Sequence, residues 1–423
     1  MLDIEFIREH VDKVRQAAEH KQLNQKVVDE VLRLDKERRD LIQKVESIKA
    51  KRNDLNDRLK KEQTEALKTE SVALKRELQD LEPQLKKVEA SFHDLMLQVP
   101  SIPAPDVPVG QDETGNQVHK TWGEKPQFDF PIKDHVTLGE NLDLIDLERG
   151  VKIGGFRSYF TKNDLVLLEQ AVLNFALNSL IAKGFTPMTV PWIVNDDALW
   201  GTGYFPWGIE DHFQTQDGQK LIGTAEVSLT AYRAGEILSE KDLPVKLVGI
   251  SPCFRREVGS HGKDTKGIFR VHQFTKVEQV VLCHNDEKES IKWHEALLKN
   301  SEEILQALKL PYQVMLMCTG DMGAGQVKKY DIETWFPGQN KYRETHSDSY
   351  FLEFQARRLN IRYKTGNGET KFVHTLNNTV AATPRLLTAI MENYQQQDGS
   401  IKIPQVLQEF VGKEVITTQK AET

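Results

Sequence analysis

Arginine, glutamate, histidine and aromatic residues concentrate in residues 253–278. This stretch contains Phe254-Arg255-Arg256-Glu257, a Gly/Lys/His-rich loop, Phe269-Arg270-Val271-His272-Gln273-Phe274 and Glu278. Guanidinium groups bind phosphate oxygens through paired hydrogen bonds and keep their charge, and an aromatic ring can stack on a base. A strand, loop and strand with arginines at both ends would place guanidiniums across one cleft, which suits a bent polyphosphate. An exposed hairpin with ordinary cross-strand ion pairs is the alternative.

Two later segments also carry polar side chains of types that bind ligands. The first is Arg343-Glu344-Thr345-His346-Ser347, and the second is Thr375-Leu376-Asn377-Asn378-Thr379, which leads to Arg385. Each is weak alone, because a glutamate and a serine three residues apart are more often a surface pair than magnesium ligands. The phosphate loop GxxxxGK(S/T), the dinucleotide turn GxGxxG, the zinc motif HExxH and the hydrolase motif GxSxG do not occur.

Length and composition indicate two or three globular domains without covalent cross-links. The chain has 423 residues and a net charge of -7, which argues against nucleic-acid binding driven by overall charge. Its 3 cysteines fit neither a disulfide framework nor a CxxC site. No run approaches the roughly 18 apolar residues of a membrane span, and the start does not resemble a signal peptide. We therefore expect a cytoplasmic protein with no membrane partner.

Apolar residues in residues 27–60 and again in 65–97 follow the alternating three and four spacing of a heptad seam. The first seam contains Val27, Val31, Leu34, Leu41, Val45, Ile48, Leu55 and Leu59, and the second contains Leu67, Leu74, Leu78, Leu81, Leu85, Val88, Phe92 and Leu95. The short break between them predicts an antiparallel helical arm about 50 Å long, with a kink or stagger at Pro83.

Basic residues gather towards the tip of this arm, where we expect no other part of the chain to neutralise them. They are Lys49, Lys51, Arg52, Arg58, Lys60, Lys61 and Lys68. An extended arm with basic residues near its tip suits phosphate contacts on an extended nucleic acid. Heptads alone more often indicate an oligomerising coiled coil, which remains the alternative.

Composition divides the chain into four parts. Residues 1–99 form a helical unit with the arm, and residues 100–108 form a proline-rich linker. Residues 109–412 alternate β-rich runs such as 245–250 with helical stretches such as 287–308, which predicts an α+β domain on an antiparallel sheet. Residues 413–423 read as a polar tail.

In this order, the segments resemble the three motifs of class II aminoacyl-tRNA synthetases, and with the arm and Thr224-Ala225-Glu226 the chain resembles the seryl-tRNA synthetase family. The likeness covers essentially the whole chain. Its specific runs are Cys253-Phe254-Arg255-x-Glu257, His272-Gln273-Phe274-x-Lys276-Val277-Glu278, Thr319-Gly320-Asp321, Pro337-Gly338-Gln339-Asn340 and Phe354-Gln355-Ala356-Arg357-Arg358. The resemblance implies motif 1 at 163–191 in a homodimer interface, motif 2 at 253–278 and motif 3 at 376–394.

The resemblance also implies an activity and its residues. L-serine would be activated by ATP to seryl-adenylate and transferred to tRNA(Ser), with tRNA(Sec) left open as a second acceptor. ATP would contact Arg255, Arg256, Glu257, Arg270, Val271, Phe274, Glu344, Thr345, His346, Ser347 and Arg385, with Arg255, Arg270 and Arg385 catalytic and with Glu344 and Ser347 holding Mg²⁺. Serine would contact Thr224, Ala225, Glu226, Arg255, Glu278, Asn377 and Thr379. Lys49, Arg52, Arg58, Lys60 and Lys61 of the arm would contact tRNA.

The chain departs from the common bacterial pattern of the family in two places. Asn378, Val380 and Pro384 replace the three glycines of motif 3, and Thr345-His346-Ser347-Asp348 replaces Ile/Val-Ser-Ser-Cys. We expect activity to survive, with His346 and Asp348 close enough to alter metal affinity. A catalytically retired tRNA-binding paralogue is the alternative. A homologue that loads a carrier protein would lack the arm, and a zinc-dependent branch is disfavoured because no Cys/His ligand cluster is apparent.

Overall fold

The computed structural model describes residues 1–62, 64–259, 264 and 266–418. These residues divide into two units, Met1–Ile102 and Pro103–Thr423. The division falls inside segment 100–108, where the sequence places a linker. Each unit has its own apolar core.

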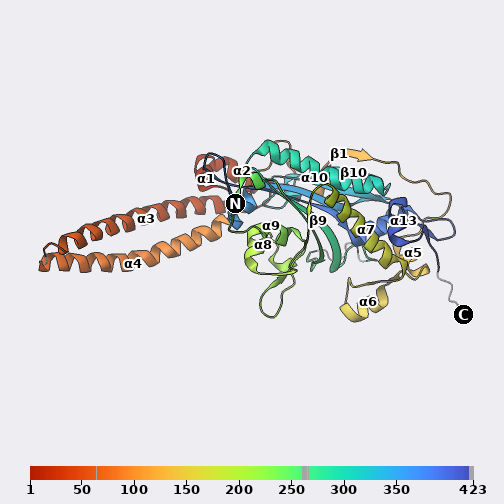
Figure 1. The fold of residues 1–423 in the computed structure, drawn as a ribbon, viewed down its shortest axis with the longest axis horizontal. Coiled ribbons are helices and arrows are strands. Elements are labelled where there is room, and N and C mark those ends of the chain that lie inside the picture. Colours follow the sequence, from red (N-terminus) through yellow and green to blue (C-terminus); the bar gives the residue numbers. More distant parts are fainter. Residues whose placement is uncertain (63, 260–263, 265, 419–423) are drawn as a thin grey trace. The chain divides into compact units, whose positions relative to one another are not determined.

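The first unit consists of helices, and its two longest helices form the expected hairpin (Figure 1). Helices α1 (Ile4–Glu9) and α2 (Val11–His20) precede α3 (Lys26–Leu59) and α4 (Glu65–Met96). Residues of the predicted seams are buried between α3 and α4, among them Val31, Leu34, Leu41, Val45, Ile48, Leu55, Leu67 and Leu78. Thr64 caps α4 by accepting a hydrogen bond from the Leu67 amide, and α4 continues as one helix through Pro83.

The root of the arm is an apolar cluster that joins the N-terminal helices to the near ends of α3 and α4. Its buried members are Ile7, Val14, Val28, Val31, Met96 and Val99. A second cluster further along the hairpin contains Val45, Ile48 and Leu78. Because the two clusters are separate, the outer part of the hairpin can be shortened without removing the root.

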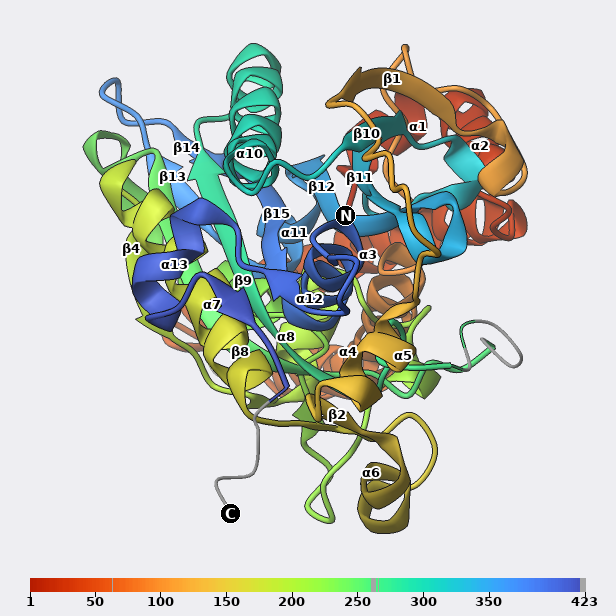
Figure 2. The ribbon, with the colours of Figure 1, turned by 90° about the vertical axis from the view of Figure 1, so that its right-hand side faces the viewer.

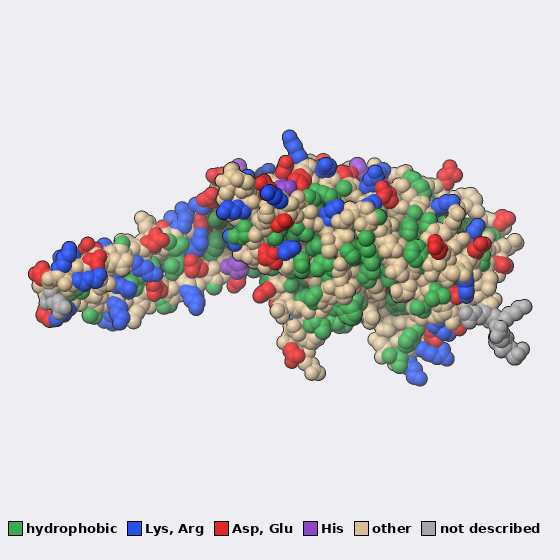
Figure 3. All heavy atoms as spheres, viewed as in Figure 1, with side chains coloured by type: hydrophobic (Ala, Val, Ile, Leu, Met, Phe, Trp, Pro, Cys, Tyr) green, Lys and Arg blue, Asp and Glu red, His purple; other side chains and the backbone are tan. Residues whose placement is uncertain are grey.

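The charges at the tip of the arm correct one expectation. Lys49 pairs with Glu82 at 2.8 Å, Lys60 with Asp57 at 2.6 Å and Lys68 with Glu65 at 2.8 Å. The expectation that no other charge neutralises these lysines is therefore wrong, and basic and acidic groups alternate along α3 and α4 (Figure 3). All these pairs are exposed, so each contributes little to stability and can exchange for a phosphate.

The second unit is built on an eight-stranded sheet, as expected for the α+β class. Its order is β1 (Gln117–Trp122), β10 (Tyr312–Leu316), β11 (Lys328–Phe336), β12 (Lys341–Leu352), β15 (His374–Ala382), β9 (Gln273–Cys283), β8 (Val245–Phe254) and β4 (Thr186–Thr189). Neighbours are antiparallel except β4 and β8. The expected antiparallel sheet is confirmed.

Alternation along β9 separates the two faces of this sheet. Val277 and Val281 join the larger core, to which α7 (Asp164–Ala182), α10 (Glu287–Ala307), α12 (Thr383–Asn393) and α13 (Gln405–Val411) contribute (Figure 2). Val280 and Leu282 join a second core with α8 (Asp196–Thr202), α9 (Glu226–Ala231) and α11 (Phe354–Leu359). Lys276, Glu278 and the second core therefore share one face, where the site described below is found.

Shorter elements complete the second unit. The helices are α5 (His135–Asn141) and α6 (Leu147–Gly154), and the strands are β2 (Ile145–Asp146), β3 (Phe160–Thr161), β5 (Ile193–Val194), β6 (Lys220–Leu221), β7 (Ile237–Ser239), β13 (Arg362–Lys364), β14 (Thr370–Phe372), β16 (Ile401–Lys402) and β17 (Val415–Ile416). Residues 413–418, expected to begin a polar tail, thus include a strand whose Ile416 is buried. Residues 419–423 lie outside the described residues.

Helix α7 has the length and apolar composition that a membrane span requires, which the sequence reading did not anticipate. It is also a core helix, because Leu165, Leu168, Val172 and Ala176 are buried against the sheet and its neighbours. Core helices of globular proteins pass the same test of length and composition.

Candidate active site

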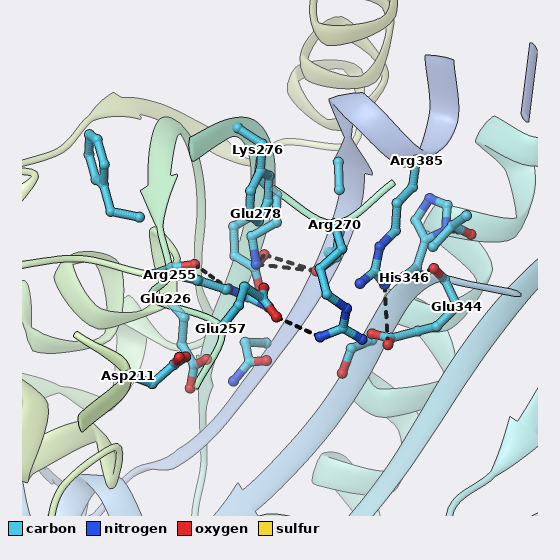
Figure 4. A pocket seen from close by; sticks show the side chains of 18 of the residues that line it. Asp211, Glu226, Arg255, Glu257, Arg270, Lys276, Glu278, Glu344, His346 and Arg385 are labelled. Atoms are coloured by element: carbon cyan, nitrogen blue, oxygen red, sulfur yellow. Dashed lines mark hydrogen bonds and ion pairs between the residues drawn. The ribbon is translucent and has the colours of Figure 1, made fainter. Parts of the chain in front are cut away.

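A cavity of about 360 Å³ opens on the face of the sheet shared by Lys276 and Glu278. Fourteen of the expected ATP and serine residues line it: Glu226, Arg255, Glu257, Arg270, Val271, Phe274, Glu278, Glu344, Thr345, His346, Ser347, Asn377, Thr379 and Arg385. They come from the β8–β9 connection and from α9, β9, β12, β15 and α12. Segments far apart in the sequence thus meet in one cavity (Figure 4).

The β8–β9 connection supplies the arginines that the sequence places across a cleft. Because β8 ends at Phe254 and the antiparallel β9 begins at Gln273, the connection leaves and re-enters the sheet at the same end. Arg255 donates from Nε to the carbonyl oxygen of Gly223 at 3.2 Å, with its guanidinium 5.4 Å from the Phe274 ring centre. Arg270 Nη1 lies 2.5 Å from Glu257 Oε2. These side chains line a cavity, so the exposed-hairpin alternative is wrong.

Arg385 and Glu344 form the opposite wall. Arg385 Nη1 lies 3.2 Å from Glu344 Oε2, and the guanidinium is 4.9 Å from the Phe269 ring centre. The Glu344 side chain is 47% exposed; partial desolvation in the cavity raises its pKa, but the charges of Arg385, Lys329 and Arg255 outweigh this effect and lower the pKa to about 2. Pro384 occupies the first turn of α12, where a missing backbone N–H costs nothing, so it does not prevent Arg385 from reaching the cavity.

The two unusual residues of the β12 segment differ in position. His346 lines the cavity, but its Nδ1 is 2.8 Å from Thr345 Oγ1 and its Nε2 is 3.1 Å from the Val380 carbonyl oxygen. Burial lowers its pKa to about 4, so the ring is neutral. Asp348 lies outside the cavity wall, with Oδ2 3.2 Å from His294 Nε2 of α10. Asp348 is therefore not placed to contact a metal at Ser347, contrary to the expectation from its sequence position.

The inner end of the cavity carries carboxylates and hydroxyls. Thr379 donates from Oγ1 to Glu278 Oε2 at 3.2 Å. Tyr204 donates to Glu226 Oε2 at 2.7 Å, and Gln355 Nε2 donates to Glu226 Oε1 at 2.9 Å. Burial and the neighbouring Glu278 raise the pKa of Glu226 to about 7. This end can accept hydrogen bonds from an ammonium group.

Three expected residues do not line the cavity. Thr224 is buried behind it and its Oγ1 accepts from the Glu226 amide at 3.2 Å, and Ala225 is also buried. Arg256 points elsewhere: its Nη1 donates to the Glu210 carbonyl oxygen at 3.0 Å, and it lines a neighbouring cavity together with Trp200 and Phe213. The adjacent residues Arg255 and Arg256 therefore line different cavities.

Sequence reasoning missed Tyr204, Lys276 and Gln355. Lys276 carried a signal, because it stands two residues before Glu278 and so faces the same side of β9. Gln355 belongs to a run singled out as specific, but no role was assigned to it. Tyr204 carried no signal, since its contact with Glu226 depends on how α8 and α9 pack.

Comparisons with known proteins agree with this geometry. The family model for the tRNA synthetase class II core domain (G, H, P, S and T) matches residues 212–394, and that for the seryl-tRNA synthetase N-terminal domain matches residues 1–103. The serine–tRNA ligase of Deinococcus radiodurans is 45% identical, over 97% of this chain and 98% of its own. That of Nitrosopumilus maritimus is 42% identical, over 98% and 99%.

The chain belongs to the seryl-tRNA synthetase family. Solved structures of family members superpose over nearly its whole length. The seryl-tRNA synthetase of Pyrococcus horikoshii complexed with ATP has a TM-score of 0.94 at 39% identity, covering 99% of this chain and 100% of its own. The cytoplasmic enzyme of Naegleria fowleri in complex with AMP has a TM-score of 0.88 at 32% identity, covering 99% of each chain.

Membership of the seryl-tRNA synthetase family confirms the expected fold class and the expected enzyme class, an ATP-dependent aminoacyl-tRNA ligase. The retired-paralogue alternative gains no support, because Arg255, Glu257, Glu344 and Arg385 all line the cavity. Among the described residues, no three or more His, Cys, Asp or Glu side chains form a group suited to a metal ion.

Proposed function

We propose that the protein activates L-serine with ATP and transfers the serine to tRNA(Ser), with the cavity as the site of both steps. The observation that carries this proposal is the meeting of Arg255, Arg270, Arg385 and Glu344 beside the carboxylates Glu226 and Glu278. Cationic groups at one end suit a polyphosphate, and acidic groups at the other end suit an amino acid's ammonium group.

ATP lies bent between the arginines in this proposal. Arg255 binds the α-phosphate and the serine carboxylate, Arg270 binds the γ-phosphate and Arg385 covers the other side of the nucleotide. Glu257 accepts from the adenine amino group, and Phe274 stacks on adenine beside Val271. Because Arg270 and Glu257 bond to each other at 2.5 Å, ATP must separate them when it binds.

The first step needs no general base, because the nucleophile is already a carboxylate. A serine carboxylate oxygen attacks the α-phosphorus, the bond to the β-phosphate oxygen breaks, and pyrophosphate leaves with the electron pair. Negative charge grows on the phosphoryl oxygens during this displacement. Fixed guanidiniums in a partly enclosed cavity stabilise that charge without waiting for water to reorganise.

The donors in the cavity fit a magnesium ion that is shared with the nucleotide. Glu344 is ionised, and Ser347 lines the same cavity. Mg²⁺ prefers oxygen ligands and often takes one or two protein groups together with substrate phosphates. Bound there, the ion would neutralise and orient the phosphates. Thr345 and His346 shape the wall beside it.

Serine selection rests on the inner end of the cavity. Glu226 and Glu278 bind the ammonium group, with Thr224 and Ala225 fixing the start of α9. Thr379 and Asn377 reach the side-chain hydroxyl. Asn377 Nδ2 is buried with no hydrogen-bond partner among the residues that the structure describes, which supports an oxygen of the substrate at that position.

Serine-dependent exchange of pyrophosphate into ATP tests the activity directly. We expect exchange with serine and Mg²⁺, and a kcat/KM for alanine lower by at least about a thousandfold, because alanine leaves buried polar groups unpaired. A panel with threonine and cysteine completes the measurement. Exchange with another amino acid in preference to serine, or with none, would overturn the proposal.

The proposed assembly is a homodimer formed through the outer face of motif 1. Val166, Leu167 and Ile181 of α7 are exposed, and so are Trp192 and Ile193 just after β4. Exposed apolar side chains gathered on neighbouring elements mark protein interfaces.

Replacing Leu167 by arginine is expected to raise the dimer dissociation constant by at least about a hundredfold, because the guanidinium would be buried without a partner. Sedimentation velocity over a concentration series measures this. Val72→Arg, at an exposed apolar residue of the arm, is the control and should remain dimeric. An unchanged dimer in Leu167→Arg would reject this interface.

The proposed tRNA contact lies on the arm. The tRNA backbone is contacted by Lys49, Arg52, Arg58, Lys60 and Lys61. Charging assays should use both tRNA(Ser) and tRNA(Sec) as acceptors.

The state of the cysteines supports a cytoplasmic location. All three cysteines, Cys253, Cys283 and Cys318, are buried and form no disulfide.

A further inference from the structure

Lys276 occupies an unusual place for a lysine. It is 5% exposed and lines the inner end of the cavity, where the proposed serine site has its carboxylates. Its Nζ lies 2.5 Å from Glu278 Oε2 and 3.3 Å from Thr379 Oγ1. Since Thr379 also donates to Glu278, the three side chains form a closed set across β9 and β15. Two of them are residues proposed to touch the substrate.

The charges at this end of the cavity do not balance without the lysine. Glu226 and Glu278 are both buried, and neighbouring buried carboxylates resist ionising together. Serine brings a single ammonium group, and its carboxylate is directed to Arg255. One positive charge from the substrate and one from Lys276 match the two carboxylates.

We propose that Lys276 is a positioning residue of the serine site, which neutralises and orients Glu278 and Thr379 so that Glu226 can ionise and receive the substrate ammonium group. This inference rests on the proposed serine site and adds a residue to it. A buried ion pair with a purely structural role is the competing explanation. The two explanations differ in what happens to Glu226.

Glu226 is the group whose ionisation reports on Lys276. It faces the Tyr204 hydroxyl, the Gln355 amide from α11, and Glu278 and Lys276 from β9. Burial and Glu278 raise the pKa of Glu226 to about 7, while the hydrogen bonds from Tyr204 and Gln355 and the charge of Lys276 lower it. The acid is thus ionised above its pKa, so KM for serine should fall as the pH rises through about 7. Removing Lys276 should move this midpoint to higher pH.

The test measures KM for serine and for ATP by pyrophosphate exchange between about pH 6 and pH 8.5, a range centred near the raised pKa of Glu226. In Lys276→Met we expect the pH midpoint of the change in KM for serine, called the serine midpoint below, to rise by about one pH unit. KM for serine at pH 7 should rise by about tenfold. KM for ATP should change by less than about twofold. This comparison separates a local effect on the serine site from a general loss of structure, which would raise KM for both substrates.

Two further variants complete a charge cycle. In Glu278→Gln the unopposed lysine should lower the serine midpoint below that of the wild-type protein. In Lys276→Met/Glu278→Gln the midpoint should return towards the wild-type value, since both charges are gone. Should Lys276→Met not fold, the comparison of Glu278→Gln with the double variant still measures the effect of the lysine on the ionisation of Glu226.

Lys328→Met is the matched control, because Lys328 is also a mostly buried lysine paired at 2.5 Å, with Asp106, but lies outside the cavity wall. It should leave both KM values and the midpoint unchanged. An identical midpoint with and without Lys276 in both backgrounds would overturn the proposal. Absence of serine-dependent exchange in the wild-type protein would instead reject the serine site itself, so the two failures are distinguishable.

Discussion

Replacing Arg255 by alanine is expected to lower the kcat for serine-dependent pyrophosphate exchange by about a hundredfold to a thousandfold. Arg255 is proposed to contact both the α-phosphate and the serine carboxylate, so its loss removes the group that aligns the nucleophile and stabilises the charge that develops. Its position beside Phe274 and the Gly223 carbonyl oxygen fixes the guanidinium before substrates bind. Steady-state pyrophosphate exchange and the single-turnover rate of adenylate formation measure the effect.

Variants at and away from this position separate chemistry from folding. Arg255→Lys keeps the charge but lacks the planar fork, so it should recover only a minor part of the lost rate. Arg233→Ala removes a surface arginine that pairs with Glu236, and it should exchange like the wild-type protein. An Arg255→Ala variant that is folded and keeps more than about a tenth of the wild-type rate would contradict the assigned role.

Shortening the arm should separate the two steps of the reaction. Deleting residues 42–87 and joining the helices by a short glycine–serine linker removes the tip lysines and the outer cluster of Val45, Ile48 and Leu78. It keeps the root cluster and the contact in which Arg38 lies 4.7 Å from the Phe92 ring centre. We expect exchange to stay within about twofold of the wild-type rate, and kcat/KM for charging tRNA(Ser) to fall by at least about a hundredfold.

A charge variant that retains the arm tests the reason for this loss. Changing Arg58, Lys60 and Lys61 to glutamate should weaken charging at low salt and flatten its dependence on salt, because fewer counterions are released from the tRNA. The ion pairs of Lys49 and Lys60 are exposed, so they should not prevent phosphate contacts. Full tRNA charging by the shortened protein would show that the arm is not the tRNA contact.

Much of the fold follows from local sequence patterns. The three and four spacing in residues 27–60 and 65–97 specifies an apolar stripe on a helix, and two such stripes joined by a short break must pair antiparallel. The predicted β-rich run 245–250 lies in strand β8, because short runs rich in β-branched residues favour strands. Contacts between residues distant in the sequence were not needed to predict these elements, because the periodicity of a segment indicates which side of it is buried.

The position of site residues was predictable only in part. The resemblance placed fourteen residues that line the cavity, but it also included Arg256, which turns to the Glu210 carbonyl oxygen. A sequence distance of one residue cannot distinguish Arg255 from Arg256, because in an irregular connection the backbone torsions set the direction of each side chain. Asp348 is a different case: it follows Ser347 within strand β12, where successive side chains point to opposite faces, so its direction away from the cavity agrees with the strand pattern.

The sequence by itself determined the helical arm, the antiparallel sheet, the order of the three motifs and the chemical types needed for adenylation. The tertiary structure decided which charges meet. It paired Lys49 of α3 with Glu82 of α4, placed Tyr204 and Gln355 on Glu226, and brought Lys276 to Glu278 and Thr379. The physical reason is that helix and strand patterns depend on neighbours within a few residues, whereas the protonation and orientation of Glu226 depend on groups that only packing brings within hydrogen-bonding distance.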